Sequence, residues 1–120
     1  MSGSLPSTIG NLEGLLRLEL QANALTGVVP TQIGNLSDLI VLYLNNNQLS
    51  GSIPATIGDL TSLQYLLLHE NQITGSIPVE IGTWRSFTTC RWTITNSLAP
   101  FLHRLAAWQT CATCAHRTIN

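Results

Sequence analysis

The sequence predicts a right-handed repeat solenoid of the α/β type, with a parallel β-sheet on its concave face and an irregular outer face. Three observations carry this prediction: a constant spacing of 24 residues, a short alternating apolar segment in each period, and one proline in each period. The prolines with this spacing are Pro6, Pro30, Pro54 and Pro78. Self-similarity at a period of about 20–50 residues is the sequence signature of stacked repeats, in which each copy is one structural unit.

Other residue types keep the same phase along the chain. Glycine forms two columns at this spacing, asparagine forms one and leucine forms three. These columns are Gly3, Gly27, Gly51 and Gly75; Gly10, Gly34, Gly58 and Gly82; Asn23, Asn47 and Asn71; Leu12, Leu36 and Leu60; Leu18, Leu42 and Leu66; and Leu20, Leu44 and Leu68. Agreement among so many residue types excludes a chance repeat.

The leucine pairs predict the strands. Leu18 and Leu20 are separated by one residue, which is the alternation of a strand with one buried face. We expect strands at residues 16–20, 40–44 and 64–68, and stacked copies bring them together in parallel. Each copy holds apolar side chains that it cannot bury alone, so stacking makes one continuous core.

The asparagine column predicts how each strand ends. The chain must turn directly after the strand, and a turn leaves backbone donors and acceptors without partners. An asparagine amide can both donate and accept hydrogen bonds. We therefore expect Asn23, Asn47 and Asn71 to form a structural ladder that satisfies the backbone of the turns.

Proline and glycine predict the outer face. Proline has no N–H group and is excluded from a helix interior or a central strand, so an irregular or short-strand outer face is expected. Gly27, Gly51 and Gly75 are expected where the backbone needs a conformation or a close approach that a side chain forbids.

The middle copy, residues 36–59, reads L-x-x-L-x-x-L-x-L-x-x-N-x-L-x-G-x-I-P-x-x-I-G-x. This pattern resembles the plant-type leucine-rich repeat of receptor-like kinases, receptor-like proteins and polygalacturonase inhibitors. The resemblance covers the chain from Met1 to about Trp84. It implies ligand recognition through the concave face, often outside the cell.

The chain is expected to have two parts. Residues 1–95 form the solenoid, with a half coil at the start and a degenerate fourth strand at 84–95. Residues 96–120 form a tail without the repeat, which is either a short capping helix or a disordered segment. The helix is suggested by apolar residues at steps of three and four: Leu98, Phe101, Leu102, Leu105 and Trp108.

The half coil at the start leads to two further expectations. We interpret the chain as a fragment of a longer array. We also expect an open N-terminal edge that promotes self-association, because an uncovered core and an open sheet edge attract other chains. The residues of this edge are Met1, Leu5, Ile9 and Leu12.

The cysteines leave three interpretations open. Cys111, Cys114 and His116 lie in a C-x-x-C-x-H arrangement, and Cys90 is the remaining cysteine. Thiolate and imidazole suit tetrahedral zinc, but a single C-x-x-C motif is weak evidence. We favour free thiols over a disulfide and a disulfide over zinc, so no metal and no cofactor are expected.

The remaining polar residues do not indicate catalysis. None of the six carboxylates or three histidines belongs to a recognisable nucleophile motif. The sequence also contains no glycine-rich phosphate-binding loop, because the repeat accounts for the glycines. The chain is therefore expected not to be an enzyme.

Charge and hydropathy bear on which classes of partner the chain binds. The formal net charge is −1, which gives no support for nucleic acid as a partner. No apolar stretch reaches the roughly 20 residues of a membrane span, and no signal peptide is recognisable, so the compartment stays open, with an extracellular or membrane-anchored parent protein as one alternative. The six acids all precede residue 81, whereas four of the five arginines follow residue 84.

Side chains between and just after the strand leucines are expected to face outward on the concave sheet. They form three columns: Arg17, Val41 and Tyr65; Glu19, Tyr43 and Leu67; and Gln21, Asn45 and His69. Aromatic side chains ringed by polar groups suit recognition of a protein or peptide. We therefore expect a protein- or peptide-binding scaffold.

Two alternatives to this function remain: a truncated ectodomain of a membrane receptor-like kinase or receptor-like protein, and a non-functional gene fragment.

Overall fold

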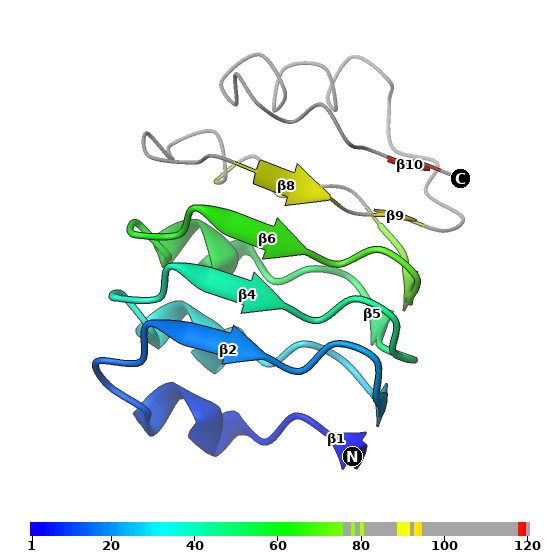
Figure 1. The fold of residues 1–120 in the computed structure, drawn as a ribbon, viewed down its shortest axis with the longest axis horizontal. Coiled ribbons are helices and arrows are strands. Elements are labelled where there is room, and N and C mark those ends of the chain that lie inside the picture. Colours follow the sequence, from blue (N-terminus) through cyan, green and yellow to red (C-terminus); the bar gives the residue numbers. More distant parts are fainter. Residues whose placement is uncertain (76–77, 79, 81–88, 92, 95–117, 120) are drawn as a thin grey trace.

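The structure is a computed structural model of the 120-residue chain, and it describes residues 1–75, 78, 80, 89–91, 93–94 and 118–119. Its main element is a four-stranded parallel sheet in the order β2-β4-β6-β8. The strands are β2 (Arg17–Glu19), β4 (Val41–Tyr43), β6 (Tyr65–Leu67) and β8 (Thr89–Arg91). Figure 1 shows them stacked side by side, one from each coil. The predicted parallel sheet of a solenoid is confirmed, with strands shorter than the predicted ranges.

The outer face is built from short elements. A 3-10 helix follows each of the first three prolines: η1 (Ser7–Asn11), η2 (Thr31–Asn35) and η3 (Ala55–Asp59). Each proline keeps an extended backbone directly before the helix, as at Pro30 with φ −69° and ψ 146°. The predicted irregular outer face is confirmed in the described coils, and the 3-10 turns add a detail that the repeat pattern did not specify.

Short strands run between the concave sheet and the 3-10 helices. β1 (Ser2–Ser4) pairs in parallel with β3 (Ala24–Thr26), and β5 (Ser50–Gly51) pairs in parallel with β7 (Gln72–Ile73). Near the C-terminus, β9 (Thr93–Ile94) pairs in parallel with β10 (Thr118–Ile119). Neighbouring coils are thus joined by backbone pairing at a second position, outside the concave sheet.

The core is a stack of leucine and isoleucine side chains. Leu42 of β4 lies in register between Leu18 of β2 and Leu66 of β6, and both Leu42 and Leu66 are completely buried. The first coil is less covered, because Leu12 is 49% exposed whereas its equivalent Leu36 is 1% exposed. The fully buried side chains are Ile33, Leu36, Leu39, Leu42, Leu44, Leu49, Ile57, Leu60, Leu63, Leu66 and Leu68.

Glycines appear where neighbouring coils come closest or where the backbone turns. A Cβ atom added to Gly34 would lie 2.6 Å from the carbonyl oxygen of Thr56 in the next coil. Gly51 has φ +71°, a left-handed conformation that residues with a side chain rarely adopt. Two glycine columns therefore serve two different needs.

Several sequence-based predictions concern residues outside this description. The backbone of Thr89–Arg91 continues the sheet with Cys90 in register with Leu66. The boundary between residues 95 and 96, the predicted helix around Phe101, and the surroundings of Cys111, Cys114 and His116 lie outside the described residues. Those predictions stay predictions.

Candidate binding face on the concave sheet

The concave sheet brings the first two predicted columns together. Arg17, Val41 and Tyr65 are in register on neighbouring strands, and so are Glu19, Tyr43 and Leu67. Side chains alternate between the two faces of a strand, so these six residues share the face opposite the leucine core. The sequence prediction and the register agree on which residues are neighbours.

The third column continues this arrangement past the ends of the strands. The N–H of Ala22 donates to the carbonyl oxygen of Asn45 at 3.0 Å, and the N–H of Asn46 donates to that of His69 at 3.0 Å. Gln21, Asn45 and His69 therefore stack on successive coils. The side-chain oxygens of Gln21 and Asn45 are buried without a hydrogen-bond partner among the described residues.

The candidate residues differ in how much surface they offer. Arg17 and Glu19 are exposed, whereas Tyr43, Tyr65 and Leu67 are half-buried. Val41 is 4% exposed and His69 is 8% exposed. Val41 lies in register between Arg17 and Tyr65, and two larger neighbours on the same face leave it little accessible area. Val41 and His69 thus support the face more than they form its surface.

One ion pair lies on this face. The Nε–H of Arg17 donates to Oε1 of Glu19 at 2.8 Å, and an Nη2 hydrogen bond reaches the same oxygen. The hydrogen bond to Glu19, with the charge of that carboxylate, raises the pKa of Arg17 above its ordinary value. A partner therefore meets a paired arginine and carboxylate at β2.

The asparagine column holds the turns that follow these strands. Nδ2 of Asn47 donates to the carbonyl oxygens of Leu20 at 2.9 Å and Leu44 at 3.0 Å. Nδ2 of Asn71 donates to those of Leu44 at 2.9 Å and Leu68 at 3.1 Å. Each amide thus bonds to its own coil and to the preceding one, which fixes the edge of the concave face.

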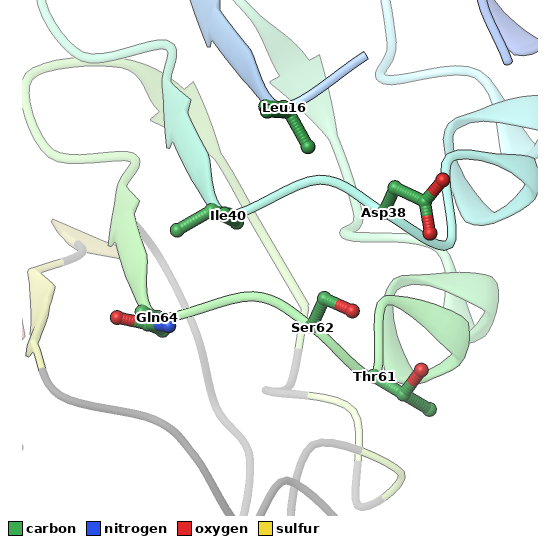
Figure 2. A pocket seen from close by; sticks show the side chains of 6 residues that line it. All are labelled: Leu16, Asp38, Ile40, Thr61, Ser62 and Gln64. Carbon is green, nitrogen blue, oxygen red and sulfur yellow. The ribbon is translucent and has the colours of Figure 1, made fainter. Parts of the chain in front are cut away.

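A groove beside the concave columns was not anticipated from the sequence. It opens at the edge where the strands begin, has a volume of about 400 Å³, and is formed by Leu16, Asp38, Ile40, Thr61, Ser62 and Gln64. Figure 2 shows these side chains arranged around one space, on segments of three successive coils. One sequence feature could have indicated this groove. Leu16 and Ile40 occupy the repeat position directly before each strand and are apolar, although this position does not belong to the core.

The possible zinc ligands Cys111, Cys114 and His116 lie outside the described residues. Within the described residues, no group of three or more histidine, cysteine, aspartate or glutamate side chains is close enough to hold a metal ion. The same part of the chain contains no helix with the length and hydropathy needed to cross a membrane.

Comparison with known proteins follows the repeat. A family model described as leucine rich repeat matches residues 7–73, which is more than half of the chain. This chain belongs to the leucine-rich-repeat family. The match spans the three coils whose strands and 3-10 helices are described above, so the family assignment and the geometry rest on the same residues. A search of curated proteins gave no match.

Solved structures place this leucine-rich-repeat protein among plant relatives. The ectodomain of the plant membrane receptor kinase GASSHO1/SCHENGEN3 from Arabidopsis thaliana, in complex with CASPARIAN STRIP INTEGRITY FACTOR 2, is 33% identical with a TM-score of 0.72. The match covers 77% of this chain and 12% of that one. The BIR3–SERK2 complex from the same organism gives 32% identity and a TM-score of 0.64, over 79% of this chain and 55% of that one.

A third relative has a different activity. A plant ice-binding protein is 31% identical with a TM-score of 0.70, over 77% of this chain and 32% of that one. The predicted resemblance to plant receptor ectodomains is confirmed. This leucine-rich-repeat chain nevertheless spans only 12–55% of the three relatives, and one fold carries several functions among them. The fold alone therefore does not identify the ligand.

Proposed function

We propose that this leucine-rich-repeat chain is a non-catalytic scaffold that binds a protein or peptide through its concave face. The observation that carries the proposal is the pair of half-buried tyrosines, Tyr43 and Tyr65, on neighbouring strands of one sheet. Tyrosine offers a large amphipathic contact area and loses little conformational entropy on binding.

The positions of the two tyrosines support one shared contact area. Val41 pairs with Tyr65 and Tyr43 pairs with Leu67, so the two tyrosines are diagonal neighbours on the same face. Diagonal neighbours in a sheet lie about 7–8 Å apart, which is within reach for aromatic side chains. A partner side chain that packs against one ring therefore also meets the other.

The surroundings of the tyrosines also support recognition. Arg17 and Glu19 are exposed at one side, and Asn45 follows Tyr43 by two residues. Interfaces commonly combine aromatic anchors with a polar rim that excludes water. The relatives found in complexes, GASSHO1/SCHENGEN3 with its partner and BIR3 with SERK2, make a binding role the natural starting hypothesis.

A second proposal keeps the same face and changes the context. The chain would then be part of the ectodomain of a membrane receptor-like kinase or receptor-like protein, as the receptor-kinase relatives suggest. A full-length transcript that continues into a membrane span and a kinase domain would establish this proposal. A transcript without either one would exclude it.

The binding proposal can be tested with a displayed library of random peptides selected on the purified chain. The enriched peptides are then measured against Tyr43→Ser, Tyr65→Ser and Gln32→Ser. Gln32 is exposed on η2, at the outer face, and serves as the matched control. We expect each tyrosine variant to lose about tenfold or more in affinity, as for an interface anchor, and the control to keep wild-type affinity.

The result that contradicts the proposal is equally clear. Peptides that bind both tyrosine variants as tightly as the wild type would exclude the concave face as the main binding surface. Circular dichroism of each variant confirms that the fold is kept, since both tyrosines lie outside the leucine core.

A further inference from the structure

The groove at the start of the strands has two chemically different ends. Leu16 is 53% exposed, which is unusual for a leucine beside a buried core, and Ile40 is half-buried next to it. Asp38, Thr61 and Ser62 supply a carboxylate and two hydroxyl groups around the other end. In Figure 2, Ile40 and Gln64 lie on one side of the groove and Asp38 and Thr61 on the other, with Leu16 and Ser62 between them.

The groove continues the concave face. Leu16, Ile40 and Gln64 directly precede Arg17, Val41 and Tyr65, the first column of that face. The backbone is also fixed here, because the N–H groups of Ile40 and Val41 both donate to the carbonyl oxygen of Leu16, at 2.8 and 3.1 Å. A partner that lies along the concave face can therefore place side chains in a preformed groove.

The carboxylate of Asp38 favours an occupant that carries a positive charge. Residues 1–80 contain six carboxylates and a single arginine, and that arginine is bound to Glu19. Among the residues that the structure describes, Asp38 forms no ion pair. A purely apolar occupant would remove this carboxylate from water without a partner, and an acidic occupant would repel it.

We propose that the groove binds a segment of a partner peptide in which an apolar side chain is adjacent to an arginine. The apolar side chain packs on Leu16 and Ile40, and the guanidinium donates to the carboxylate of Asp38. Arginine fits better than lysine, because its planar group carries several donors that can also reach the hydroxyl oxygens of Ser62 and Thr61. This proposal rests on the binding function proposed above and specifies the chemistry of the partner.

The size of the groove agrees with this occupant. Sites for complete small molecules have volumes of about 300–1,000 Å³ and enclose most of the ligand. The groove, at about 400 Å³, is at the lower end of that range and is open to solvent, so it suits one or two side chains of a longer chain.

A dipeptide tests the proposal directly. The isotope-labelled full chain is titrated with N-acetyl-leucyl-arginine amide and with the same dipeptide containing citrulline, a neutral isostere of arginine, while amide shifts are followed by NMR. We expect shifts at Asp38, Ser62 and Gln64, and an affinity about two- to fivefold higher for the arginine compound, as an exposed ion pair gives. No shift at these amides, or equal affinity for both dipeptides, would overturn the proposal.

Two variants separate this ion pair from general charge effects. Asp38→Asn should remove the preference for arginine over citrulline and keep the weaker binding of both. Asp59→Asn makes the same charge change at an exposed position at the end of η3, and the preference should persist there. Loss of the preference in both variants would show a non-specific charge effect and would contradict the proposal.

A C-terminal arginine of the same chain is the alternative occupant that this experiment must exclude. If Arg104→Gln combined with Arg117→Gln strengthens dipeptide binding, the chain's own C-terminal segment fills the groove and the partner proposal is wrong. Unchanged dipeptide binding supports the partner. The two proposals can fail separately. If the dipeptides show no preference but the library peptides still require Tyr43, the groove proposal is wrong and the concave face remains a binding surface.

Discussion

The side-chain oxygen of Asn71 accepts a hydrogen bond from the backbone N–H of Leu49 at 2.9 Å, so one coil satisfies a backbone donor of the coil before it. Asn47 accepts the N–H of Leu25 in the same way at 3.1 Å. The asparagine column therefore connects neighbouring coils through their backbones. Since the stability of a repeat protein is close to a sum of nearest-neighbour terms, each of these side chains stabilises two coils.

Replacement of Asn47 by leucine tests this connection. The change leaves the N–H of Leu25 without its side-chain acceptor. It also removes one of the two asparagine donors from the carbonyl oxygens of Leu20 and Leu44, which keep the amides of Asn23 and Asn71. We expect a loss of about 1–3 kcal/mol in the free energy of unfolding, the usual penalty for unsatisfied buried backbone groups. Urea denaturation followed by circular dichroism measures it.

Gln48→Leu is the matched control, because Gln48 is exposed and adjacent in sequence. Substitutions at such surface positions usually change stability by less than about 0.5 kcal/mol. Equal destabilisation by both variants would mean that the asparagine ladder contributes nothing specific.

Gly34→Ala tests the close approach between coils. The added Cβ would lie 2.6 Å from the carbonyl oxygen of Thr56 and 2.8 Å from its Cβ atom, so η2 and η3 must move apart. Overpacking of a well-packed contact costs about 1–3 kcal/mol. Thermal unfolding should show a lower melting temperature.

Gly14→Ala provides the comparison for this contact. Gly14 has φ +77° and no atom within 4 Å of an added Cβ, so the change has only the conformational cost of about 1 kcal/mol. A smaller loss for Gly34→Ala than for Gly14→Ala would show that the coils separate without resistance, against the packing described above.

Ala22→Asn should stabilise the protein. Ala22 has φ +56°, in the left-handed region, and Asn46 occupies the equivalent position of the next coil with φ +57°. Asparagine adopts this region more readily than alanine, so we expect a gain of roughly 0.5–1 kcal/mol in denaturant unfolding. Ala24→Asn, in the extended strand β3, is the control and should give no gain. A gain at Ala24 and none at Ala22 would contradict the conformational explanation.

The repeat spacing was sufficient to predict the strands, because a 24-residue period and the Leu18–Leu20 alternation admit few other structures. The conformation of Ala22 could not be predicted in the same way. Alanine has no preference for positive φ, and the N–H of Ala22 is bound to the carbonyl oxygen of Asn45 in the next coil, a contact that the sequence of one coil does not reveal. The tight contact of Gly34 with Thr56 is likewise a property of two stacked coils, although the glycine column marked its position.

The candidate site was predictable in outline. Register follows from the repeat, so the columns around Tyr43 and Tyr65 could be listed by position. The accessibility of these side chains could not be predicted, because the burial of Val41 depends on the size of the side chains on both sides. The groove was missed for a related reason: it combines the slot of Leu16, Ile40 and Gln64 with the slot of Asp38 and Ser62, whereas the repeat pattern compares residues within one slot.

The exposed first coil leads to a prediction about association. Leu12 is 49% exposed, whereas the equivalent Leu36 and Leu60 are 1% and 0% exposed. An exposed apolar edge next to open strands favours contact with a second chain, so the 120-residue chain should self-associate with rising concentration. Leu12→Gln should weaken this association, as measured by analytical ultracentrifugation, with little change in the unfolding transition.

Leu36→Gln makes the same chemical change in the core and should instead destabilise the fold by about 2 kcal/mol or more. A wild-type chain that stays monomeric over the whole concentration range, or a Leu12→Gln variant that associates as strongly as the wild type, would exclude this edge as the contact surface.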